Sequence, residues 1–231
     1  MPSKIIEPGQ IESFATTPPF VLLPPSDVFA RRAERLDANA PGHPLAAYLN
    51  LMVRVARAQD AVLKDPPDLP PLNTHSLEMA LQHRMPPLAV DSLLQDKDWQ
   101  TVLDAWLTRF TEQNPDLPEP VTRALTRLEE ADPAQRLEWA VRLTAGRFSE
   151  LPSAIVPFLG AGLQLAWTLW LGQVEAKGVR EQKDQTECPC CGSLPVVGVI
   201  HQHSPVDGAR YLLCSLCATQ WHFVRLKCSH C

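Results

Sequence analysis

The stretch Cys188-Pro-Cys-Cys-Gly-Ser193 decides the fold, together with Cys214-Ser-Leu-Cys217, which is separated from Cys191 by 22 residues. All seven cysteines of the chain lie from Cys188 onward, and the first 187 residues contain none. Two thiolates three positions apart on a tight turn can both reach one tetrahedral ion, and Gly192 can take the positive φ that folds the chain back over the sulfurs. The gap suits two such knuckles joined by a β-hairpin. The sequence therefore predicts that Cys188, Cys191, Cys214 and Cys217 bind one metal ion.

Two other uses of paired cysteines fit this pattern less well. Disulfides are typical of small secreted domains, whereas a long cysteine-free region precedes these cysteines and no signal peptide is recognised. A thioredoxin-like redox pair would be a single Cys-x-x-Cys that opens a helix after a strand, but Pro189 and the β-prone residues after Gly192 favour a turn and a strand. Cys190 is interpreted as a thiol that is not a ligand, with a redox-active spare sulfur as the alternative.

Cys228 and Cys231 form a third pair, which cannot complete a tetrahedral shell by itself. Three explanations are open: the sequence stops short of a fourth pair, histidines supply the missing ligands, or two chains share the metal as a homodimer. The histidines available in this region are His201, His203, His222 and His230. We favour the first explanation because the sequence halts on a cysteine, so that Cys228 and Cys231 are expected to be half of a second site.

Composition limits the classes of protein that the chain can belong to. Its 231 residues suffice for one ordinary domain and a small second one, and 45% hydrophobic residues can form a real core. A net charge of −5 argues against a general nucleic-acid binder, which would normally be basic. Clustered thiols without an export signal indicate the bacterial-type cytoplasm or another reducing compartment.

The region before the cysteines is predicted to be helical after an extended, proline-rich arm over residues 1–25. The clearest signal is a one-faced apolar stripe from Trp99 to Phe110. Leu45, Tyr48 and Met52 belong to another stripe, which begins after Pro44. Helices are expected from Ser26, over residues 44–63, weakly around 77–83, over 99–110, and near 118–130 and 133–147.

Residues 151–174 carry no charge, which would suit a membrane span by length. The segment contains Pro157 and three glycines, and no basic cluster flanks its N-terminal end, so a buried central helix capped by Ser153 and ended by Gly178 is favoured over a span. A charged linker over 177–187 then precedes strand-like sequence. The expected class is mainly α. Four segments are expected: an arm (1–25), an all-helical domain (26–176), the linker (177–187), and a rubredoxin-like or zinc-ribbon metal domain (188–231). The metal domain could also consist of two tandem modules, of which the second is incomplete in this sequence.

Several of these motifs together resemble the family of formate dehydrogenase accessory proteins called FdhE. In the tail they are the run from Cys188 to Ser193, Arg210-Tyr-Leu212, Cys214-Ser-Leu-Cys217, Trp221-His222, Arg225 and Cys228-Ser-His-Cys231. In the helical part they are Arg31-Arg-Ala-Glu-Arg-Leu36, His43-Pro-Leu45 with Tyr48, and Leu151-Pro152 leading to Gln164 and Trp167. That family has a fourth Cys-x-x-Cys further along, which this sequence lacks.

The resemblance implies a cytoplasmic protein needed for respiratory formate dehydrogenases to become active, in contact with their catalytic subunit before export. It also implies rubredoxin-like sites that hold iron. A tetrathiolate motif accepts zinc equally well, so the residues leave the metal open. Two other functions also remain open: a rubredoxin-like electron-transfer protein, and a zinc-ribbon module that binds nucleic acid or protein. No arrangement typical of an enzyme is present, and a closed four-sulfur site leaves no position for a substrate.

Overall fold

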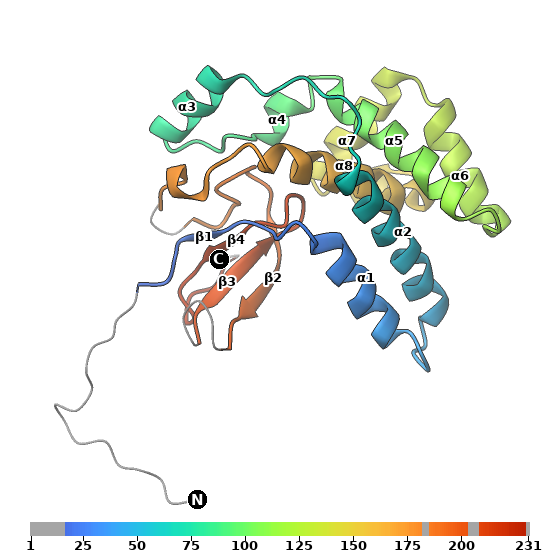
Figure 1. Cartoon of the computed structure of the whole chain (residues 1–231), viewed down its shortest axis with the longest axis horizontal. Helices are drawn as coiled ribbons and strands as arrows, with labels where there is room; N and C mark the ends of the chain where they lie inside the picture. Colours follow the sequence, from blue (N-terminus) through green and yellow to red (C-terminus); the bar gives the residue numbers. More distant parts are fainter. Residues whose placement is uncertain (1–16, 182–184, 203–207, 230–231) are drawn as a thin grey trace, which may run out of the picture.

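The computed structural model describes residues 17–181, 185–202 and 208–229, and all structural statements below concern these residues. A body of helices comes first along the chain, and a small antiparallel sheet follows (Figure 1). The fold is therefore mainly helical with a C-terminal β unit, as the sequence predicted. The α-helices are α1 (Val28–Asn39), α2 (Ala46–Lys64), α3 (Thr74–Gln82), α4 (Val90–Leu93), α5 (Asp98–Gln113), α6 (Glu119–Glu130), α7 (Pro133–Thr144) and α8 (Val156–Leu171).

The helix boundaries follow local signals in the sequence. Asn73 and Asp132 each accept a hydrogen bond from the backbone three residues later and so cap α3 and α7. Pro133 is the first residue of α7, where a missing N–H costs nothing. The apolar stripe of α5 is fully buried as predicted; its members are Trp99, Val102, Leu103, Trp106, Leu107 and Phe110.

Helix α8 lies at the centre of the body and packs against α2, α5 and α7. Its run with the preceding 3₁₀ turn, Ser153–Leu171, is the one helix in the described part of the chain that is long and apolar enough to cross a membrane. Because 67% of the tested window is buried inside the protein, this is the pattern of a core helix. The helix is shorter than predicted, since it ends at Leu171 with Gly172 as the C-cap and Gly178 lies beyond it.

The sheet contains four antiparallel strands in the order β1-β4-β3-β2. Strands β2 (Pro195–Ile200) and β3 (Arg210–Cys214) form the hairpin between the two cysteine knuckles, and β4 (Gln220–His222) follows the second knuckle. Strand β1 (Val21–Leu22) comes from the N-terminal arm and pairs with β4, Val21 opposite Trp221. The arm therefore supplies an edge strand to the sheet.

One apolar core extends through the helices and the sheet. Trp221, Leu212 and the knuckle cysteines belong to the same buried cluster as the side chains of α5 and α8. Polar contacts also cross from the early chain to the sheet, since the Tyr211 hydroxyl donates to the Pro19 carbonyl at 2.8 Å and the His222 amide donates to the Phe20 carbonyl at 2.8 Å. The sheet thus shares its apolar core with the helices and is tied to the N-terminal arm by hydrogen bonds.

Candidate metal centre

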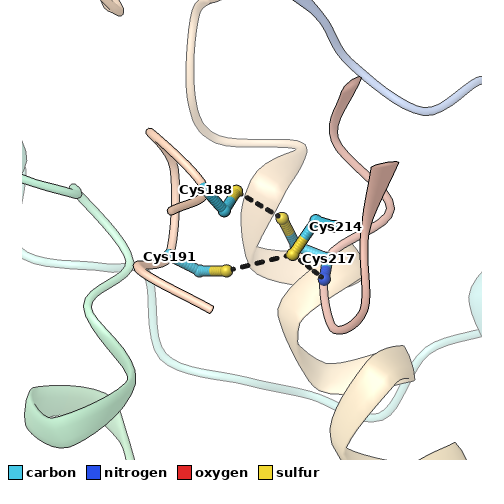
Figure 2. Close-up of side chains that lie close together, drawn as sticks. All are labelled: Cys188, Cys191, Cys214 and Cys217. Atoms are coloured by element: carbon cyan, nitrogen blue, oxygen red, sulfur yellow. Dashed lines mark hydrogen bonds between the residues drawn. The ribbon is translucent and has the colours of Figure 1, made fainter. Parts of the chain in front are cut away.

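Four cysteine side chains from two knuckles face one another (Figure 2). In the first knuckle the Gly192 amide donates to the Cys188 carbonyl at 2.8 Å, and the Cys188 amide donates to the Ser193 carbonyl at 2.8 Å. In the second the amides of Leu216 and Cys217 donate to Cys214 Sγ at 3.3 and 3.4 Å. We call the group of Cys188, Cys191, Cys214 and Cys217 the four-cysteine centre.

The residue after the second cysteine has positive φ in both knuckles. Gly192 has φ of 81° and Ala218 has φ of 57°. Glycine takes this conformation without strain, whereas a side chain with a Cβ is strained there. The two knuckles therefore have the same backbone turn, although only the first has glycine, the residue type that predicts such a turn.

The spacing of the sulfurs fits a tetrahedral ion. All four Sγ atoms lie within 4.8 Å of one another, with 3.5 Å between Cys188 and Cys217 and 3.4 Å between Cys191 and Cys214. Metal–sulfur bonds of about 2.3 Å place tetrahedral ligands about 3.8 Å apart, whereas a disulfide would need about 2.05 Å. The arrangement matches a metal site, and none of the cysteines in the described residues forms a disulfide.

Burial controls the protonation of this centre. All four cysteines are almost completely buried. Burial raises the pKa of the thiols of Cys188, Cys214 and Cys217, because their ionised forms would lose hydration. Burial also acts to raise the pKa of Cys191, but hydrogen bonds from the other three thiols outweigh it and bring that pKa well below its usual range. An ion bound between the four sulfurs would favour their ionised forms and so offset the cost of burying them.

The helical body holds both knuckles through specific hydrogen bonds. The amides of Leu88 and Val90 donate to the carbonyls of Cys190 and Cys191 at 2.8 and 3.2 Å. The Trp167 indole on α8 donates to the Leu88 carbonyl at 2.9 Å. These contacts join α8, the segment before α4 and the first knuckle into one chain of hydrogen bonds.

Gln164 of α8 bridges the second knuckle and α1. Its Nε2 donates to the Ser215 carbonyl at 2.9 Å, and its Oε1 accepts from Arg32 Nη1 at 2.8 Å. Gln164 and Trp167 lie in the sequence motif quoted above, but their roles depend on contacts with residues more than 50 positions away. Sequence alone offered no signal for these contacts.

The other described cysteines, Cys190 and Cys228, do not belong to the four-cysteine centre. Cys190 is buried and is not among the residues that could hold the ion, whereas Cys228 is exposed. Cys231 lies outside the described residues. The role of Cys228 and Cys231 as half of a second site therefore stays a prediction.

The histidines offered as alternative ligands have other contacts where they are described. His201 Nε2 lies 2.7 Å from Gln220 Oε1, and the rings of His201 and His222 pack edge-on against Tyr211. His203 and His230 lie outside the described residues. The structure therefore brings together the two cysteine pairs that spacing predicted.

The fold and the centre define a class of protein: a helical body packed against a small β sheet that carries two cysteine knuckles, which together form one four-cysteine centre. Family models described as "FdhE, N-terminal" and "FdhE, central domain" match residues 17–184 and 187–225. The chain belongs to the FdhE family, as the sequence motifs indicated.

Relatives match over nearly the whole chain. A "Protein FdhE homolog" of Stutzerimonas stutzeri is 51% identical and covers 100% of this chain and 75% of its own length. A "Protein FdhE" of Escherichia coli is 37% identical, covering 93% of this chain and 68% of its own. The crystal structure of the FdhE protein from Pseudomonas aeruginosa superposes with a TM-score of 0.85 at 47% identity, over 92% of this chain and 72% of that one.

Proposed function

We propose that this protein is an accessory factor for respiratory formate dehydrogenase, and that it binds the catalytic subunit in the cytoplasm before export. The support is membership of the FdhE family over nearly the whole chain, with both family models in sequence order. No residue of the chain is assigned a catalytic step. In this function the protein acts by contact with its partner.

The observation that carries the metal part of the proposal is the convergence of four buried sulfurs within 4.8 Å. Cys188, Cys191, Cys214 and Cys217 would hold one ion, which we propose to be iron in a rubredoxin-type site, with zinc as the alternative. The ion would cross-link the two knuckles, and iron could in addition carry one electron. The centre is closed and buried beneath the helices, which favours a structural role over electron transfer to a diffusing partner.

The division of the chain into segments and the second site also remain proposals. We propose the arm 1–25, the helical domain 26–176, the linker 177–187 and the metal domain 188–231. Cys228 and Cys231 would give two ligands of a second ion whose other ligands come from elsewhere.

The metal proposal is tested by elemental analysis and visible spectra of anaerobically purified protein. We expect one tightly held ion per chain at the four-cysteine centre, red if ferric. Cys214→Ser should lose this ion and Cys228→Ser should retain it, because only the first lies in the centre. Wild-type protein that held neither iron nor zinc would contradict the proposal.

The accessory role is tested in cells that lack their own FdhE protein. Expression of this chain should restore formate-dependent dye reduction, and the catalytic subunit should be recovered with the tagged protein. A chain that restored no activity and recovered no subunit would overturn the role, whatever metal it held. Cys214→Ser in the same strain then shows whether the ion is needed for the contact.

A further inference from the structure

An apolar groove lies at the junction of the helical body and the sheet. Its volume is about 480 Å³, and its walls come from α2, α8, the segment after α7, the start of β2 and the second knuckle. Large apolar side chains line it yet are exposed to solvent: Tyr48 (51%), Phe148 (59%), Leu194 (57%) and Val196 (66%). Exposed apolar surface gathered in a hollow is typical of a binding site for another molecule.

The β wall of this groove is an edge strand. Strand β2 is last in the order β1-β4-β3-β2, and Figure 1 shows it on the side of the sheet that faces α1. From Leu194 to Ile200 the sequence carries no charged residue, and most of these side chains are exposed. Proteins usually protect such edges with charges, because an unpaired strand accepts another chain. The edge therefore favours an extended polypeptide as the occupant, paired along β2.

The groove also contains one cation without an anionic partner among the described residues. Arg32 lines the wall, where it donates a hydrogen bond to the Gln164 amide oxygen and lies over the face of the Phe29 ring. Burial lowers the pKa of Arg32, and no acidic residue is among those that line the groove. By contrast, the neighbouring Arg31 pairs with Asp27 at 2.9 Å. A partly buried guanidinium of this kind is complementary to a carboxylate.

We propose that this groove binds an extended, apolar segment of the partner protein, which adds as a strand to β2 and places a carboxylate against Arg32. The proposal rests on the proposed function, in which the partner is the formate dehydrogenase catalytic subunit. Gln164 connects the groove to the metal centre, because it contacts Arg32 and the Ser215 carbonyl together. Ser193 and Ser215 of the two knuckles line the same groove, so an ordered centre shapes the contact surface.

The test is a binding titration of the purified chain, loaded with metal, against the purified catalytic subunit. Arg32→Gln removes the charge while keeping a hydrogen-bonding side chain, and Val196→Lys places a charge on the apolar rim. The matched controls are Arg31→Gln, on the same helix but paired with Asp27, and Val224→Lys, which is also exposed (58%) but lies outside the groove. Circular dichroism and metal content establish that each variant is folded.

We expect Arg32→Gln and Val196→Lys each to weaken binding by about tenfold or more, and the controls to stay within about twofold. Hydrogen exchange of the backbone amides in residues 194–200 should slow in the complex. If Arg32→Gln bound as tightly as wild type, or exchange in 194–200 did not change, the groove would not be the site.

Two further results have a defined meaning. Absence of binding by the wild-type chain would overturn the accessory role and, with it, this occupant. Self-association of the wild-type chain that Val196→Lys abolished would assign the groove to a second copy and overturn the proposal.

Discussion

Replacing Trp167 with phenylalanine tests whether α8 holds the first knuckle in place. The indole N–H donates to the Leu88 carbonyl, and the Leu88 amide donates in turn to the Cys190 carbonyl. Trp167→Phe leaves the buried Leu88 carbonyl without this donor, which should cost about 1–3 kcal/mol. Loss of ring volume adds about 1–2 kcal/mol. We therefore expect the free energy of unfolding to fall by about 2–5 kcal/mol.

Trp106→Phe is the matched control. Trp106 is as fully buried as Trp167, but its indole N–H finds no acceptor among the described residues. The same volume is lost, while removal of an unpaired buried donor returns about 1–3 kcal/mol. The two contributions nearly cancel, so Trp106→Phe should be milder than Trp167→Phe by about 2 kcal/mol or more.

The assay is urea unfolding followed by far-UV circular dichroism at a fixed metal concentration, since bound metal itself shifts stability. The rate at which a chelator removes the ion is measured in parallel. Trp167→Phe should release the ion faster than wild type, whereas Trp106→Phe should not. Equal losses of stability in the two variants, or a larger loss in Trp106→Phe, would refute the reasoning.

Three other predictions concern the knuckles and the central helix. Gly192→Ala should lower the free energy of unfolding by about 1–2 kcal/mol, because alanine is strained at the positive φ of this residue. Ala218→Gly should change that free energy by less than about 1 kcal/mol. The midpoints of urea unfolding of the two variants and the wild type measure both effects. Binding of the ion should release protons, because burial raises the pKa of the thiols of Cys188, Cys214 and Cys217 while a bound ion favours their ionised forms. Apparent affinity should therefore fall as pH falls. Calorimetry in two buffers measures the protons released, and an affinity that did not change with pH would contradict this expectation. Gly162→Ala should lower the free energy of unfolding by about 1–3 kcal/mol, because the added Cβ would lie 2.5 Å from the side chain of Leu103 on α5. Gly160→Ala should raise it by up to about 1 kcal/mol, because the nearest atom to its Cβ, on Leu143, is 3.8 Å away and alanine favours a helix. Thermal unfolding of both variants shows whether the two effects have opposite signs.

Features set by residues near one another in sequence were predictable. The stripe from Trp99 to Phe110 identified α5 and its buried face, because helical periodicity is local. The spacing of the cysteines predicted that one hairpin joins the two knuckles, because the two pairs are close enough in sequence for a single hairpin to connect them. Even the positive φ of Ala218 had a signal, since it occupies the position that Gly192 holds in the first knuckle.

Features that depend on distant contacts were not predictable. Strand β1 in the arm pairs Val21 with Trp221 of β4. A strand of two residues has no sequence pattern that predicts it, and its partner lies about 200 residues further along the chain. Tyr48 was expected on a buried stripe of α2, but it lines the apolar groove and is half exposed. Apolar periodicity identifies the face of a helix that avoids water, and a binding groove gives the same pattern as a core.

The position of the four-cysteine centre indicates what a bound ion would contribute to the proposed accessory role. The sulfurs lie under the helices, and residues between or beside the cysteines, Ser193 and Ser215, form part of the groove wall. The ion would fix the two knuckles relative to each other, and Gln164 transmits that position to Arg32 through one side chain. A groove built in this way requires a tetrahedral ion but no particular redox state, so zinc and iron would serve it equally. In this proposal the identity of the metal would matter less than the shape of the groove that the metal would maintain.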